Sequence, residues 1–199
     1  MRLKTFALTS CLSLFLTASL AVPNTYATST KPITDSTKPW TITFSKDVSN
    51  ETANLDQITI SSVNKKLSLS VSANSNKVIV KTKKPYLFGE RYTLTIPASF
   101  LANNGKELKK NVTQDFEITG QYIKTIQAIL NPFLTNISIT APEATFASYS
   151  INGGSTINMI RNLSSFSKGQ IGLLKGDLLK VQVFDETKEI LETHYYEVK

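Results

Sequence analysis

The sequence predicts an all-β protein made of two small β-sandwich domains in tandem, behind a signal peptide and a short linker. From Trp40 onward, apolar residues recur with a period of two, which is the spacing of a strand with one buried face. Turn-forming residues interrupt this pattern about every ten residues, as in a sandwich or barrel. The length of 199 residues favours one or two domains.

The N-terminal residues have the order of an export signal. The first four carry two basic side chains, and Thr5–Val22 contains no charge. Thr25 and Ala27 suit the −3 and −1 positions of a cleavage site, so we place the cut after Ala27, with Ala21 as an alternative. We therefore predict residues 1–27 as a signal peptide. The competing interpretation is an uncleaved membrane anchor, which the many Thr and Ser residues of this stretch disfavour.

The only cysteine, Cys11, lies inside the predicted signal. The residues before it resemble a lipobox, but the strongest apolar run, Leu12–Val22, comes after Cys11 instead of before it. We therefore expect a mature chain without disulfides, thiol nucleophiles or cysteine-bound metals.

Residues 28–38 form a polar tract in which Ser-Thr-Lys-Pro occurs twice. Such a composition offers little apolar surface to offset the entropy lost on ordering. We predict a Thr/Ser/Lys/Pro linker that stays exposed until the folded part begins near Trp40.

The mature chain is modestly basic. Removing residues 1–27 takes away Arg2 and Lys4 and no acid, so the net charge of +7 falls to +5. Lysine pairs are scattered along the chain, which is typical of a solvated surface and not of a nucleic-acid site. We expect a weak, salt-sensitive attraction to anionic wall polymers or lipid head groups. The predicted partner is an anionic cell-wall polymer or another surface protein, and the oligomeric state is left open.

Candidate strands follow one another through both halves of the chain. Each places β-branched or aromatic residues at alternate positions, and Gly, Asn or Pro residues separate the runs. Residues 122–130 fit both a strand and a short helix. Gly105 and Gly176 are expected in turns, where glycine tolerates positive φ. The predicted strands are 40–44, 57–61, 67–71, 78–80, 92–96, 116–118, 137–140, 145–151, 178–184 and 194–198.

Four short runs follow one another in the first half of the chain. They are Trp40-Thr-Ile-Thr-Phe-Ser-Lys-Asp-Val48, Tyr86-x-x-Gly89-x-x-Tyr92-Thr-Leu-Thr-Ile96, Asn104-Gly105-Lys-x-Leu108 and Asp115-Phe-Glu-Ile118. In this order they resemble the bacterial Ig-like domain found in S-layer and other wall-associated proteins. The resemblance covers residues 39–119 and implies a β-sandwich that acts as a spacer or display module and carries no catalytic residue.

Several residues of this pattern also have expected structural roles. Gly89 and Tyr92 have the spacing of a tyrosine corner, in which the hydroxyl binds backbone upstream. Trp40 opens the first strand and is expected to be structural. Residues 120–199 are expected to form a second small sandwich, because Gly176 precedes the run 178–184 much as Gly89 precedes the run at Tyr92. No family is recognised in this second part.

The sequence offers little material for catalysis or metal binding. The only histidine, His194, lies in the last predicted strand and is expected to be an ordinary, partly exposed residue. Asp47, Glu51 and Asp56 are interpreted as turn residues and not as a glycosidase pair. Calcium would need Asp177 to lie near Asp185 and Glu186, which we do not expect. We therefore predict no enzymatic activity, no cofactor and no metal.

One segment mixes basic and aromatic residues, from Lys83 to Tyr92. With Tyr92 in the corner and Phe88 in the core, Tyr86 would remain exposed beside the basic residues and could stack on a ligand. The predicted binding residues are Lys83, Lys84, Tyr86 and Arg91.

Together these features predict a secreted or cell-surface-associated, non-catalytic binding or spacer protein of the bacterial envelope, of the Gram-positive type. The end of the chain carries no Leu-Pro-x-Thr-Gly sorting motif, so attachment is expected to be noncovalent, with no integral membrane segment after signal removal. Two alternatives stay open. One is a secreted hydrolase or hydrolase inhibitor that acts on wall polymer or protein, and the other is a structural subunit of an extracellular layer or fibre.

Overall fold

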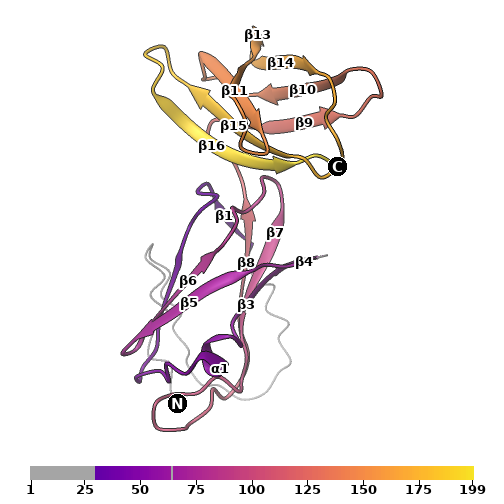
Figure 1. Cartoon of the computed structure of the whole chain (residues 1–199). Helices are drawn as coiled ribbons and strands as arrows, with labels where there is room; N and C mark the ends of the chain where they lie inside the picture. The colour runs from indigo at the N-terminus through magenta and orange to yellow at the C-terminus, as the bar shows by residue number, and fades with distance from the viewer. Residues whose placement is uncertain (1–29, 64) are drawn as a thin grey trace, which may run out of the picture. The chain divides into compact units, whose positions relative to one another are not determined.

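The computed structural model describes residues 30–63 and 65–199, and its regular structure is almost entirely β-strand (Figure 1). The all-β prediction is therefore confirmed. The predicted signal peptide, residues 1–27, lies outside the described residues. The chain divides into two compact units. One contains Thr37–Lys84 and Arg91–Phe116 with the chain up to Lys31, and the other contains Pro32–Ser36, Pro85–Glu90 and Glu117–Lys199.

The first unit is built on two sheets, in which β3 pairs with β4 and β7, and β6 with β2 and β5, all antiparallel. Alternating apolar and polar residues give each strand one buried face, as in β2, where Trp40 and Ile42 are fully buried. The five-stranded sheet has the order β1-β8-β7-β3-β4 and the three-stranded sheet the order β2-β6-β5. The elements are β1 (Lys31–Ile33), β2 (Trp40–Thr43), α1 (Thr52–Leu55), β3 (Thr59–Ser62), β4 (Lys65–Lys66), β5 (Leu69–Asn74), β6 (Lys77–Thr82), β7 (Arg91–Ile96) and β8 (Val112–Ile118).

Aromatic side chains centre the first core. The Trp40 and Phe116 ring centroids lie 4.7 Å apart, and Tyr92 stacks on Phe116 at 5.4 Å. A second pair, Phe44 and Phe100, stacks at 5.3 Å. Aromatic pairs at these separations add to the free energy gained by burial alone. Trp40 and Tyr92 therefore both serve the core of this unit.

The second unit is a sandwich of two four-stranded sheets with the orders β13-β14-β10-β9 and β12-β11-β15-β16. Its core is one cluster, to which Ile139 of β10, Tyr149 of β11 and Val181 of β15 contribute buried side chains. The strands are β9 (Thr125–Ile129), β10 (Thr135–Thr140), β11 (Phe146–Ile151), β12 (Ile157–Asn158), β13 (Ile160–Asn162), β14 (Ser165–Gln170), β15 (Leu178–Phe184) and β16 (Ile190–Glu197).

The polar tract 28–38 is not an exposed linker from residue 31 onward, and that prediction is wrong. Strand β1 pairs with β8, and the Thr119 amide donates a 2.9 Å hydrogen bond to the Ile33 carbonyl. Ile33 is 5% exposed and Ser36 is 3% exposed. Strand pairing and one well-placed isoleucine offset the ordering entropy, and neither effect is visible in the composition of the tract.

Two further details follow from the structure. Residues 125–129, which fit either a strand or a helix by sequence, form strand β9. Gly105 and Gly176 adopt φ values of 72° and 91°, and Gly89 adopts 76°. All three stand at turns in the left-handed region, where a side chain would be strained.

We predict that Phe116→Ala destabilises the protein by about 3–5 kcal/mol, because it empties space between two buried aromatic rings. The change is measured by denaturant unfolding, followed through the fluorescence of Trp40, the only tryptophan of the chain. Phe133→Ala is the control, since that side chain is 84% exposed. Its effect should stay within about 0.5 kcal/mol. Equal losses for both variants would contradict this view of the first core.

Candidate functional site

A polar cluster is buried in the second unit, where Ser36, Glu192 and His194 are 3%, 8% and 0% exposed. Strand β16 pairs with β15 so that His194 lies opposite Val181 and Glu192 opposite Val183, which places both polar side chains on the buried face. The expectation of a partly exposed His194 is wrong. The alternation of the strand places the His194 side chain on the buried face. Burial of this polar ring is possible because Ser36, which is distant in sequence, supplies a hydrogen-bond partner.

His194 is held between a hydroxyl and a carboxylate. Its Nδ1 lies 2.8 Å from Oγ of Ser36, and its Nε2 lies 3.1 Å from Oε1 of Glu192, in a contact bent away from ideal hydrogen-bond geometry. An ionised carboxylate only accepts, so we assign the ring proton to Nε2. The Ser36 hydroxyl then donates to Nδ1, while Nε2 faces the Glu192 carboxylate without a well-directed hydrogen bond.

Glu192 also closes the loop that leads into β9. Its carboxylate accepts hydrogen bonds from the backbone amides of Gln121, Tyr122 and Ile123 at 2.8, 2.9 and 2.8 Å. Three successive amides that converge on one carboxylate form a concave anion site filled by the protein itself.

The tight turn before these amides requires glycine at position 120. A Cβ atom there would lie 1.9 Å from the Ile123 carbonyl oxygen and 3.2 Å from Oε2 of Glu192. Because the first contact is with backbone, no side-chain rotation can relieve it.

Burial alone would raise the pKa of Glu192. The bonds from His194 and from the Ile123 and Gln121 amides together outweigh that effect and lower the pKa to about 2. Glu192 is therefore ionised at every physiological pH, although its side chain is almost wholly enclosed. The cluster is a buried ionised group whose partners are all supplied by the fold.

The same three residue types form the catalytic machinery of serine hydrolases, but here the arrangement is closed. In those enzymes Nε2 faces the serine and Nδ1 faces the carboxylate, whereas in this chain the two nitrogens are exchanged. The Phe88 ring packs 5.0 Å from the His194 ring. Since Ser36 and His194 are buried, a substrate carbonyl has no access to the hydroxyl.

A shallow groove of about 310 Å³ in the second unit is lined partly by Phe88 and by the first residues of β9. Among the described strands, β9 is an edge strand of its sheet, next to β10. Lys199 at its rim forms a 2.8 Å ion pair with Glu90, which raises the pKa of the lysine. The lining residues are Phe88, Gly89, Lys124, Thr125, Ile126, Gln127, Tyr196 and Lys199.

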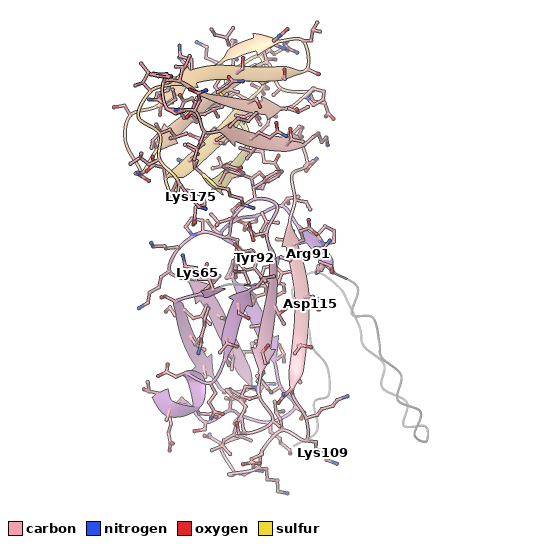
Figure 2. All side chains as sticks on the ribbon, turned by 90° about the vertical axis from the view of Figure 1, so that its right-hand side faces the viewer. Lys65, Arg91, Tyr92, Lys109, Asp115 and Lys175 are labelled. Atoms are coloured by element: carbon pink, nitrogen blue, oxygen red, sulfur yellow. The ribbon has the colours of Figure 1, made fainter. Side chains whose placement is uncertain are left out.

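The four predicted binding residues do not share one environment. Lys83, Lys84 and Arg91 are exposed, whereas Tyr86 is fully buried. The expectation of an exposed, stacking Tyr86 is therefore wrong. Its amide donates a 2.8 Å hydrogen bond to the Ser36 carbonyl, and this bond fixes its segment against the polar cluster. On the first unit, Lys65 and Lys109 project at well-separated places (Figure 2).

The acids considered for calcium are far apart. Asp177 precedes β15 and Asp185 follows it, so seven extended residues, on the order of 20 Å, separate them. Within residues 30–63 and 65–199, no group of three or more His, Cys, Asp or Glu side chains is placed to hold a metal ion. The hydroxyl bond expected of a tyrosine corner at Tyr92 stays a prediction.

The sequence profile of the bacterial Ig-like domain matches residues 16–118, so the chain belongs to the bacterial Ig-like domain family. The match extends upstream of Trp40 and includes β1. This agrees with the folded state of the polar tract from residue 31.

Several solved structures resemble the chain distantly. The N-terminal part of the bacterial S-layer protein SbsC shares 16% identity, with a TM-score of 0.38, over 86% of this chain and 43% of that protein. The pullulanase SAP of GBS, solved with maltotetraose, shares 13% identity, with a TM-score of 0.30, over 82% of this chain and 22% of the other. The chain thus spans less than half the length of either.

No curated protein sequence matches the chain. In the described part of the chain, none of the helices is long and apolar enough to cross a lipid bilayer.

We predict that Gly120→Ala lowers the stability of the protein by about 2–4 kcal/mol, because its Cβ collides with a carbonyl oxygen and displaces the amides from Glu192. Gly153→Ala is the matched control, since nothing lies within 4 Å of a Cβ there, although φ is 77°. That control should cost only about 1 kcal/mol. Thermal unfolding by circular dichroism measures both, and equal losses would contradict a special role for Gly120.

Acid should remove the contribution of Glu192 to stability. Because its folded pKa of about 2 is below the ordinary value of 4.5, the contribution is complete above pH 4.5 and is lost as the pH falls toward 2. The loss should be roughly 3 kcal/mol. Glu192→Gln should be less stable at neutral pH and should lose less stability between pH 4.5 and 2. Parallel pH profiles for the variant and the natural protein would refute this assignment.

Proposed function

We propose that this chain is a secreted, cell-wall-associated protein of the bacterial envelope that works by binding or spacing and not by catalysis. The observation that carries the proposal is the closed state of the polar cluster. His194 is the only histidine, so any histidine-assisted nucleophile would have to act through it. That ring is fully buried and is engaged in holding the second unit together.

Membership of the bacterial Ig-like family supports the same proposal. In a β-sandwich the sheets form a rigid scaffold, while the loops and sheet edges vary between proteins. Binding residues are therefore expected in the loops and at the sheet edges. Exposed basic residues of the first unit, among them Lys83, Lys84 and Arg91, are suited to an anionic wall polymer.

A binding experiment with purified cell wall tests this function. The chain from Thr28 is incubated with Gram-positive wall, with and without its anionic polymers, at low and moderate salt. We expect saturable retention that requires the anionic polymers and weakens with salt, because exposed charges are screened. Absence of retention under all conditions would overturn the proposal.

A pair of matched variants tests the residues. Lys83→Ala/Lys84→Ala should weaken retention roughly fivefold, if each exposed charge contributes about as much as a surface ion pair. Lys109→Ala/Lys110→Ala removes the same charge from another exposed place and should have less effect. Equal effects would assign binding to net charge alone and exclude a site at Lys83 and Lys84.

A further inference from the structure

Exposed apolar side chains gather at one end of the second unit. They lie on the β9–β10 hairpin and at the start of the loop after β14. Single exposed apolar residues are ordinary, but a contiguous group marks an interaction surface. The group, named here the apolar tip, consists of Ile129 (66% exposed), Leu130 (39%), Phe133 (84%), Leu134 (53%) and Ile171 (75%).

The strand register brings the two loops together. Asn136 of β10 pairs with Ile129 on one side and with Gly169 on the other, and Thr135 pairs with Gln170. Leu134 covers Gly169 so closely that a Cβ atom there would lie 3.0 Å from the leucine side chain. Figure 1 shows both loops at the same end of the sandwich, where β9 and β14 end. The tip is thus formed by two neighbouring loops at one end of the sandwich, with side chains that are well exposed.

The chain segments that form the tip carry no acidic residue of their own between 125 and 142 or between 164 and 176. Residues 125–142 contain no charged side chain, and Lys168 and Lys175 are the charged residues of 164–176. The next acid along the chain, Asp177, accepts a bond from the Leu174 amide of its own loop at 2.7 Å and another from Asn152, in the turn after β11, at 2.8 Å.

The outer face of the adjoining sheet is also free of charge. Its positions alternate with the buried Ile126, Ile139 and Phe166. They include the polar Gln127, Ser138 and Ser167, and also the exposed Ile160, which pairs with Ser167. A protein that binds at a bilayer surface places apolar side chains at the acyl chains, and polar and basic side chains at the headgroups. The apolar tip, with its neighbouring polar groups and lysines, matches this arrangement.

We propose that the apolar tip docks the second unit onto an anionic lipid bilayer. Phe133, Leu134 and Ile171 enter the boundary between acyl chains and headgroups, while Lys168 and Lys175 contact anionic headgroups. Phe133 and Ile171 are 84% and 75% exposed, and a fluid bilayer accepts such exposed side chains without a complementary pocket. The inference goes beyond wall association and does not depend on it.

Vesicle flotation tests the proposal. The chain from Thr28 is mixed with phosphatidylcholine vesicles that contain either no anionic lipid or about one third phosphatidylglycerol. Binding to the anionic vesicles is expected, with at least about a tenfold loss for Phe133→Ser/Ile171→Ser. Phe146→Ser/Ile190→Ser removes two other exposed apolar side chains of the same unit, 43% and 58% exposed, and should bind normally.

A fluorescence measurement locates the contact. Trp40 is the only native tryptophan and is fully buried, so Phe133→Trp adds one exposed reporter at the tip. Lipids brominated near the headgroup should quench the new tryptophan and leave Trp40 unquenched.

Three outcomes would overturn the proposal. They are no binding to anionic vesicles, equal loss of binding in both double serine variants, or self-association in solution that Phe133→Ser/Ile171→Ser abolishes. The last result would assign the tip to a second copy of the chain.

Wall retention serves as the independent control. If the tip variant binds wall normally but fails to float with vesicles, the two activities are separate and the lipid assignment stands. If the natural protein binds wall and never binds vesicles, the lipid proposal alone fails.

Discussion

The second unit depends on one buried carboxylate and on the partners that keep it ionised. Glu192 receives three backbone amides from residues 121–123, and through His194 it is connected to Ser36, which precedes that histidine by 158 positions. Three segments far apart in sequence are therefore fixed by one polar cluster. An ionised group in an apolar core would be strongly destabilising without such bonds, so the fold and the cluster require each other.

This constraint also bears on function. A serine, a histidine and a glutamate in contact would indicate hydrolysis if they opened onto a cleft, but here all three are buried, and the Phe88 ring packs 5.0 Å from the His194 ring. The three side chains are instead held inside the second unit by fixed contacts. The binding activities that we propose rest on other parts of the chain, the exposed lysines of the first unit and the apolar tip.

The strands could be predicted from the sequence wherever alternation was strong, as at Trp40, Tyr92 and Val181. Apolar alternation does not predict those strands that form because they pair with a neighbouring strand and not because of their own composition. Strand β14 was missed because Ser165–Gln170 contains a single large apolar residue, and β1 because Ile33 stands alone in a polar tract. The burial of Tyr86 and His194 was missed for a related reason. Their partner Ser36 is distant in sequence, and no local signal links the three residues.

Hydrogen exchange at the amides of Gln121, Tyr122 and Ile123 tests the central claim most directly, in the natural protein and in Glu192→Gln. The account predicts strong protection of these amides in the natural protein. In the variant that protection should be lost, with exchange in the first unit, for example at Ile60, unchanged. Equal protection of the three amides in both proteins would show that the loop holds itself without the carboxylate. It would contradict the view that Glu192 organises the second unit.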